Sequence, residues 1–220
     1  MLEFHNLIDA YMQCRKNKRG SSAALAFEVD YEHNLWELYN DIIDGSYKIN
    51  PSTAFVVERP VKREIFASDF RDRVVHHFVM GALIPRLEKE FIYDSYACRA
   101  GRGTLFGVKR IRRFIAQCSD GYTKDCYILK CDILGFFMNI DRDLLWQELK
   151  SFIYSSISDY NFIRTPHSSS TARTLFSDID DAESATDSIF INLVYQIVMN
   201  NPIDGCCIKG KGSFYKKSFN

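Results

Sequence analysis

An aspartate in an apolar stretch is the first residue whose position suggests chemistry. Asp132 lies within residues 128–140, which read ILKCDILGFFMNI. The apolar and β-branched residues around it predict a buried strand. A carboxylate there costs several kcal/mol unless it is paired, hydrogen-bonded or bound to a cation. We therefore expect a partner for Asp132, and an aspartate that is hydrogen-bonded to nearby backbone amides remains the structural alternative.

A concentration of basic residues is the second feature. Residues 55–114 contain 13 Lys and Arg against 7 Asp and Glu, in a chain whose net charge is zero. The candidates for contact with phosphate groups are Arg99, Arg102, Lys109, Arg112 and Arg113. The first two lie in a glycine-containing loop, and the last three share one face of an expected helix. Clustered cations favour a nucleic-acid backbone, and a solvated helix face is the alternative.

Several other patterns carry no functional prediction. The glycine motifs GRGTLFG and GCCIKGKG depart from the dinucleotide and phosphate-loop patterns. His76 and His77 lie in the most apolar expected helix and are interpreted as core histidines. The seven cysteines lack metal-ligand spacing. With no leader peptide and no apolar run long enough to span a membrane, we expect a cytoplasmic protein that does not contact membranes.

These residues need helices and a hairpin to position them. Apolar periodicity and turn residues predict helices over residues 6–19, 23–43, 70–84, 104–117 and 142–153, and strands over residues 47–59 and 62–66 that form a hairpin. Ser68 or Asp69 is the expected cap of the third helix, Thr104 of the fourth and Asp141 of the fifth. Pro85 should kink or end the third helix.

The remaining sequence is more polar. Residues 155–188 contain two basic and six acidic residues, which predicts a polar insertion without a packed core. An apolar segment over residues 188–200 should be ordered, and the last twenty residues have no obvious core partner. The chain is long enough for one large domain or two small ones. The pattern as a whole predicts a helix-rich α+β protein.

Read in order, the segments resemble prokaryotic reverse transcriptases of the diversity-generating-retroelement and retron-like branch. Residues 61–77 (VKREIFASDFRDRVVHH) resemble the fingers, and residues 91–104 (FIYDSYACRAGRGT) resemble the template-side block that follows. Residues 129–145 (LKCDILGFFMNIDRDLL) are similar to the first catalytic block of the palm. The resemblance implies fingers plus an incomplete palm, with residues 1–125 fingers-like and residues 126–220 the N-terminal part of the palm.

The resemblance also implies roles for individual residues. Asp132 matches the first metal-binding aspartate, and the carbonyl of Ile133 matches the adjacent backbone ligand for magnesium. Phe137 matches the bulky side chain that excludes the sugar 2′-hydroxyl. Lys62 and Arg63 match the residues that hold the incoming triphosphate, with Arg59 as the alternative because the basic spacing here differs from the common pattern.

One part of the family pattern is missing. The palm of these enzymes needs a later Tyr-x-Asp-Asp hairpin, and the sequence contains none. We therefore expect a chain truncated before that block, in which Mg²⁺ is weakly bound or absent and which does not polymerise alone. The implied partners are an RNA template, a DNA or RNA primer and deoxynucleoside triphosphates, with self-association through the unfinished palm. The alternatives are a non-catalytic nucleic-acid-binding module and a plain domain with only historical similarity.

Overall fold

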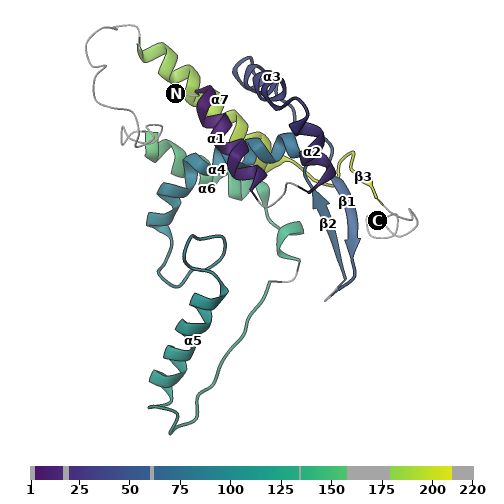
Figure 1. The fold of residues 1–220 in the computed structure, drawn as a ribbon. Coiled ribbons are helices and arrows are strands. Elements are labelled where there is room, and N and C mark those ends of the chain that lie inside the picture. Colours follow the sequence, from purple (N-terminus) through teal and green to yellow (C-terminus); the bar gives the residue numbers. More distant parts are fainter. Residues whose placement is uncertain (1–2, 17–19, 60–61, 134, 158–178, 210–220) are drawn as a thin grey trace. The chain divides into compact units, whose positions relative to one another are not determined.

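The computed structural model describes residues 3–16, 20–59, 62–133, 135–157 and 179–209 (Figure 1). Within these ranges the chain forms seven α-helices and one three-stranded sheet, so the predicted helix-rich α+β class is confirmed. The chain divides into two compact units. The first unit comprises Met1–Ala82 and Asp141–Asn220, and the second comprises Leu83–Ile140.

The first unit begins with helix α1 (Phe4–Arg15), which corresponds to the helix predicted over residues 6–19. The next predicted helix is divided into two. The prediction of a single helix over residues 23–43 is wrong, because the chain forms two helices there, α2 (Ser22–Glu28) and α3 (Tyr31–Ile43). Asp30 breaks the helix with φ −140° and ψ 60°. The side-chain amide of Asn34 donates to the carbonyl of Phe27 at 2.9 Å. This bond satisfies a carbonyl at the end of α2, and apolar periodicity alone gives no sign of it.

Aromatic side chains from four helices meet around Tyr11 of α1. Tyr11 is buried and stacks on Tyr31 with ring centroids 5.6 Å apart. Phe27 lies 5.3 Å from Phe70, whose ring also meets Tyr11 edge-on at 6.3 Å. Large rings bury much apolar area per residue. This cluster therefore links α1, α2, the start of α3 and the start of α4 (Phe70–Glu90).

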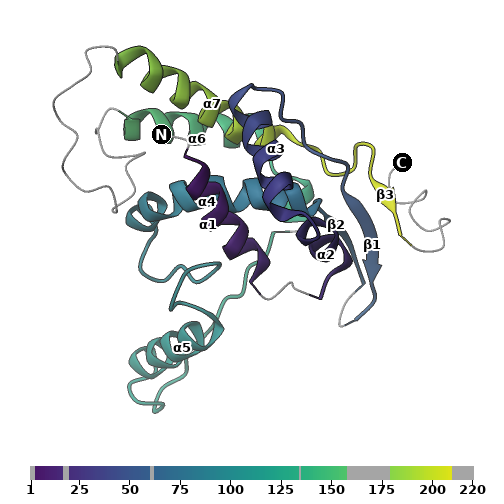
Figure 2. The same cartoon turned by 45° about the horizontal axis from the view of Figure 1, so that its top comes forward.

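The predicted hairpin is confirmed. Strands β1 (Thr53–Val57) and β2 (Arg63–Ala67) pair antiparallel, with Phe55 opposite Ile65. Strand β3 (Cys207–Ile208) adds to β1 in parallel, so the sheet order is β2-β1-β3 (Figures 1 and 2). The segment near residue 207 thus has a partner that the sequence did not reveal, and residues 210–220 lie outside the described part of the chain.

Helix α4 starts where expected and continues further than predicted. Of the two predicted caps, Asp69 accepts the Arg71 backbone N–H at 3.0 Å. The helix does not end at Pro85 but runs on to Glu90. Proline removes one backbone donor and crowds the residue four positions earlier.

Burial along α4 is one-sided rather than complete. The buried apolar residues are Phe70, Val74, Val75, Val79 and Leu83. Met80 and Ile84 are exposed, so the most apolar of the expected helices is not buried on every side. His76 is half-buried, and burial lowers its pKa. The exposed position of His77 contradicts its interpretation as a core residue.

A buried carboxylate connects α4 to the chain before the hairpin. Asp72 is 0% exposed and accepts hydrogen bonds from the Tyr47 hydroxyl at 2.8 Å and the Asn50 backbone N–H at 2.9 Å. Burial raises the pKa of the Asp72 carboxyl, while these two bonds act in the opposite direction. Burial beside this carboxylate also raises the pKa of Tyr47. Arg71 contributes a longer contact to Asp72 at 3.9 Å.

The rest of the first unit is a helix pair. Asp141 accepts the Leu144 N–H at 2.9 Å, which confirms it as the cap of α6 (Arg142–Ile157). Helix α7 (Ile179–Met199) packs on α6, with Trp146 and Tyr195 rings 5.1 Å apart. The predicted polar insertion over residues 155–188 overlaps both helix ends, and its residues 158–178 lie outside the described part of the chain.

The second unit contains the end of α4, helix α5 (Thr104–Cys118) and a short 3₁₀ helix, η1 (Phe136–Met138). The predicted buried strand around Asp132 is wrong, because residues 125–133 have no regular structure. Tyr127 is 91% exposed and Leu129 is 87% exposed. A strand needs a pairing partner as well as a β-rich composition, and the described residues supply none here.

The Asp72 contacts generate a stability prediction. Replacing Asp72 with alanine leaves the Tyr47 hydroxyl and the Asn50 N–H without their acceptor, at a cost of about 1–3 kcal/mol for each unsatisfied donor. Asp9→Ala is the matched control, because Asp9 is exposed on α1 and should change stability by less than about 0.5 kcal/mol. Denaturant unfolding of both variants measures the difference. Equal losses would show that the buried carboxylate contributes nothing specific.

Candidate nucleic-acid interface and the Asp132 segment

Helix α5 presents most of the predicted phosphate-binding residues. It begins at Thr104, so the N-cap is Gly103 rather than the predicted Thr104, and no side chain caps it. None of its residues is fully buried. Lys109, Arg112 and Arg113 are exposed on the helix. Their shared face is therefore open to a ligand within the second unit.

A bidentate ion pair holds α5 to the preceding loop. The Arg110 guanidinium donates to Asp94 through Nε at 2.6 Å and through a terminal nitrogen at 2.8 Å. The Tyr96 hydroxyl donates to the same carboxylate at 2.6 Å. These bonds lower the pKa of Asp94 to about 2 and raise the pKa of Arg110. We call this group the Asp94 clasp.

Aromatic rings surround the Asp94 clasp. The Arg110 guanidinium lies 4.9 Å from the Tyr93 ring centroid and 4.6 Å from that of Phe114. A side-chain methyl at Gly107 would lie 3.4 Å from the Tyr96 ring, which is an ordinary van der Waals distance, so the Tyr96 ring lies against α5 at this position. The cation–π contacts with the Tyr93 and Phe114 rings add to the attraction that holds the Arg110 guanidinium in place. Arg110 was not among the predicted residues, because its acidic partner is sixteen residues away and no local spacing relates them.

Arg99 is not available to a ligand in this structure. Its side chain is 4% exposed and pairs with Glu88 at 2.7 Å. It also donates to the carbonyls of Ile92 at 2.9 Å and Ser95 at 3.1 Å. The hydrogen bonds from Arg99 lower the pKa of Glu88. Arg99 thus closes the loop from within, which differs from the predicted phosphate contact.

Arg102 has an intermediate position. It donates to the Tyr93 carbonyl, and its guanidinium lies 4.2 Å from the Tyr93 ring centroid and 5.5 Å from that of Phe106. Its side chain is half-buried. The five predicted contacts therefore separate into one interior arginine, one half-buried arginine and three exposed cations on α5.

The Asp132 carboxylate faces solvent rather than a core. One of its oxygens accepts the backbone N–H of Ile133 at 2.9 Å. Both residues are exposed. This local bond is the structural alternative named from the sequence, and it leaves the other carboxylate oxygen without a recorded bond within the described residues. The exposed site gives Asp132 no need of a counter-charge.

The residues after Asp132 form a short turn. Gly135 has φ +59°, a left-handed conformation that favours glycine. The turn leads into η1, where Phe136 and Phe137 meet edge-on with ring centroids 5.4 Å apart. Phe137 is 82% exposed. The side chain predicted to contact a sugar is thus presented to solvent and not packed as a core aromatic.

The predicted triphosphate ligands belong to the first unit. Lys62 directly precedes β2 and Arg63 is its first residue. Both are exposed, as is the alternative residue Arg59. They lie near the turn of the hairpin, where long cationic side chains can reach a ligand. Asp132 and Phe137 belong to the second unit.

The described residues contain no group of three or more His, Cys, Asp or Glu side chains that could hold a metal ion. The predicted metal ligands, Asp132 and the Ile133 carbonyl, are therefore not joined by a cluster of further acidic side chains among the described residues. Mg²⁺ accepts few protein ligands when phosphates complete its shell, but two Mg²⁺ ions need more anionic ligands than these.

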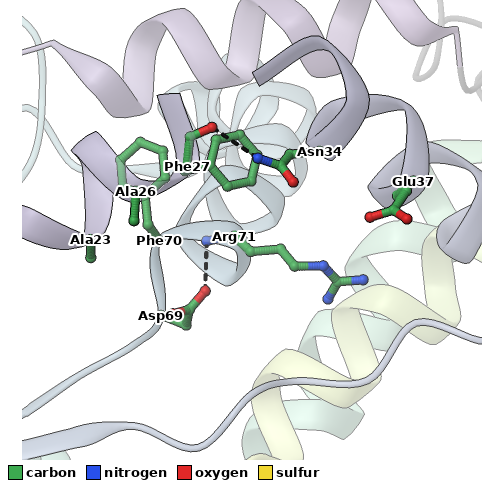
Figure 3. Close-up of a pocket in the computed structure, with 8 residues that line it drawn as sticks. All are labelled: Ala23, Ala26, Phe27, Asn34, Glu37, Asp69, Phe70 and Arg71. Atoms are coloured by element: carbon green, nitrogen blue, oxygen red, sulfur yellow. Dashed lines mark hydrogen bonds between the residues drawn. The ribbon is translucent and has the colours of Figure 1, made fainter. Parts of the chain in front are cut away.

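A cavity of about 290 Å³ lies in the first unit, between α2, α3 and the start of α4 (Figure 3). Its lining residues are Ala23, Ala26, Phe27, Asn34, Glu37, Asp69, Phe70 and Arg71. Much of its polar lining is already bonded within the protein. Arg71 pairs with Asp41, Asp69 accepts the Arg71 N–H, and Asn34 donates to the Phe27 carbonyl. The sequence analysis did not identify this cavity.

Comparisons with known proteins add no family assignment. No protein-family model matches the chain. No curated protein matches it either. Among the helices that the structure describes, none is both long and apolar enough to cross a membrane.

The Asp94 clasp generates a pH prediction. Because the folded-state pKa of Asp94 is lowered to about 2, its stabilising effect is present above the unfolded pKa near 4 and is lost as pH falls from about 4 to 2. Asp94→Asn should remove this part of the pH dependence. Amide hydrogen exchange of α5 at pH 6, 4 and 2 measures it.

The control for the Asp94 clasp is Asp125→Asn, an exposed carboxylate in the same unit. It should retain the wild-type loss of α5 protection between pH 4 and 2. If Asp94→Asn and Asp125→Asn gave the same profile, the clasp would not be what orders α5.

Proposed function

We propose that this chain contains the fingers-like part and the first catalytic block of an RNA-directed DNA polymerase. The observation that supports it best is an exposed carboxylate, Asp132, within an apolar segment that no described residue covers. The particular activity is proposed because several blocks of the sequence resemble reverse transcriptases in their order and spacing. Asp132 and the Ile133 carbonyl are the proposed metal ligands.

The exposed segment around Asp132 has the properties of a strand that could pair with another strand. Its backbone forms no ladder within the described residues, and Tyr127, Leu129 and Ile133 are exposed. An extended apolar chain with unpaired backbone groups is a template for strand addition. A hairpin that paired here could cover the apolar side chains and bring its own carboxylates beside Asp132, as the Tyr-x-Asp-Asp hairpin does in the family.

The described residues do not by themselves form a catalytic metal centre. One carboxylate and one carbonyl fit part of a magnesium site, and templated polymerisation requires two ions. Under this proposal the further carboxylates come from outside the described residues.

The remaining roles concern substrate binding. Lys62 and Arg63 would form charge-assisted hydrogen bonds to the triphosphate of an incoming deoxynucleotide. Phe137 would lie against its sugar and exclude a 2′-hydroxyl. An RNA template and its primer are the expected nucleic acids. The exposure of these three side chains is compatible with each role.

A second candidate function is non-catalytic nucleic-acid binding by α5. It is favoured by one specific observation, namely that the Asp94 clasp holds α5 through Arg110 while Lys109, Arg112 and Arg113 remain exposed. Cations held on a rigid helix contact phosphates without first having to be ordered. This function does not need Asp132, so the two candidates can be tested separately.

The binding function predicts a salt-dependent affinity for single-stranded RNA. Each phosphate contact adds about 0.7 to the slope of log affinity against log salt. Arg112→Glu combined with Arg113→Glu should reduce that slope by about 1.4. Fluorescence anisotropy with a labelled RNA at several salt concentrations measures the slope.

The matched control for this charge reversal is Lys48→Glu combined with Lys150→Glu. Both lysines are exposed in the first unit, and the net charge changes equally. The control should keep the wild-type slope. An equal reduction in both double variants would mean that only net charge matters and that α5 is not the binding surface.

The polymerase function predicts that a Tyr-x-Asp-Asp block has to be present beside Asp132 before a primer can be extended. A protein that includes this block should extend a primer on an RNA template with Mg²⁺, and the 220-residue chain should not. Asp132→Asn in the longer protein should lower the extension rate by about 10³-fold or more, since metal ligands provide several kcal/mol of transition-state stabilisation.

Asp125→Asn is the control for that experiment and should retain wild-type extension. Primer extension by the 220-residue chain itself, or unchanged extension after Asp132→Asn, would contradict the proposed site. Salt-dependent RNA binding without any extension by the longer protein would leave the non-catalytic function.

A further inference from the structure

The segment between α5 and η1 leaves its backbone and its apolar side chains open. Within the described part of the chain, residues 125–133 form no backbone–backbone hydrogen bond, and none of them has a positive φ. Figure 1 draws this stretch as an extended run from the end of α5 to η1. Tyr127, Leu129 and Ile133 are exposed. An extended apolar stretch with both edges free can add another strand.

The charges and the apolar residues of this segment alternate. Successive side chains of an extended chain point to opposite faces. Leu129, Cys131 and Ile133 therefore share one face, which is apolar. The other face carries Lys130 and Asp132, and both residues are exposed. The segment thus presents a cation and an anion two residues apart, behind an apolar face.

A second copy of the same segment complements this pattern when it runs antiparallel. If Cys131 lies opposite the partner's Cys131, then Lys130 lies opposite the partner's Asp132, and Leu129 lies opposite the partner's Ile133. The two-fold axis repeats both pairs. A shift of one residue to either side would place Asp132 opposite the partner's Leu129 or opposite the partner's Cys131. Parallel pairing in register would place like charges opposite each other, which is unfavourable.

A hydrogen bond within the segment fits the same register. The Ile133 backbone N–H already donates to the Asp132 carboxylate at 2.9 Å. Antiparallel strands alternate between hydrogen-bonded and non-hydrogen-bonded pairs, and only the second kind leaves the N–H free for such a bond. Ile133 and Cys131 therefore belong to non-hydrogen-bonded pairs, in which the Cα atoms are about 4.5 Å apart and the side chains are closest. The second oxygen of Asp132 has no recorded bond with a described residue, so it can accept from the partner's Lys130.

We infer that two copies of this chain associate through residues 127–133, which pair antiparallel around Cys131 into a two-stranded ribbon. Four features carry the inference: the open backbone, the apolar face, the opposite charges two residues apart, and the bond that fixes Ile133 in a non-hydrogen-bonded pair. It goes beyond the proposed function and does not depend on it. A ribbon of this kind would cover Asp132, so the same segment could not pair with another strand on that edge at the same time.

The apolar face of the ribbon needs a second layer, because an isolated two-stranded ribbon is only marginally stable in water. Helix α5 belongs to the same unit and exposes Leu105, Val108 and Ile111. These residues are three positions apart and form an apolar stripe along one side of the helix. Residues 119–124 form a short turn between α5 and the segment, and elements joined by short connections usually lie side by side. The two α5 helices of a dimer can therefore cover the ribbon.

Charge exchange at the two central positions tests the register. Lys130→Glu and Asp132→Lys each turn two attractive pairs into two repulsive ones, so each should weaken self-association by at least about tenfold. An equimolar mixture of the two variants should associate as the wild-type protein does, because every introduced charge then lies opposite a charge of the other sign. Sedimentation equilibrium in reducing buffer, over a range of concentrations, measures all four samples.

Lys124→Glu and Asp125→Lys are the matched controls, since they make the same charge changes at exposed positions outside the ribbon. Each alone should associate as the wild-type protein does. A wild-type protein that stays monomeric at every concentration would overturn the inference. So would wild-type association by Lys130→Glu alone, or a mixture of Lys130→Glu and Asp132→Lys that stays monomeric.

Disulfide trapping tests which residues meet at the two-fold axis. The full chain is oxidised with diamide, alkylated and digested with trypsin, which cleaves after Lys130 and leaves Cys131 at the start of its peptide. The expected first product joins two copies of that peptide. Cys131→Ser should lose this product and still form the non-covalent dimer. Earlier formation of an intermolecular link through another cysteine would contradict the Cys131 register.

Discussion

The second unit depends on one ion pair, between Asp94 and Arg110. Helix α5 has fifteen residues and buries none of them fully, so apolar burial cannot supply most of its order. Isolated helices of this length are marginal in water. The bidentate contact at 2.6 and 2.8 Å, with the Tyr96 hydroxyl on the same carboxylate, supplies fixed partners instead. The direction in which α5 presents its exposed cations is therefore set by a single carboxylate in the preceding loop.

Arginine has an interior role elsewhere in the same unit. Arg99 uses its guanidinium to close the loop between α4 and α5, through Glu88 and two carbonyls. Arg102 lies over the Tyr93 ring in the same loop. A planar guanidinium with five donors suits this work better than lysine does. The basic composition of the segment is thus partly structural, and only the cations beyond the loop remain for a ligand.

The features that could be predicted from the sequence are those that local residue patterns determine. The caps at Asp69 and Asp141, the hairpin and most helix starts depend on residues within a few positions of each other, and the structure confirms them. The failures depend on distant partners. The strand around Asp132 requires a pairing strand, and Arg99 found an acidic partner eleven residues away. The break between α2 and α3 depends on a side-chain bond from Asn34 that periodicity does not show.

The exposure of Asp132 reverses the reasoning that first drew attention to it. A carboxylate in water needs no counter-charge, so Asp132 imposes little cost on the described structure. Under the proposed function a cost would arise when a partner covers the apolar segment and brings further carboxylates, because like charges would then approach each other in a less polar environment. Covering this segment and binding a cation would then be coupled: the apolar side chains would favour association, and the carboxylates would oppose it until a metal ion neutralised them. The aspartate would then make assembly of the site conditional on metal, and a neutral residue at this position would not.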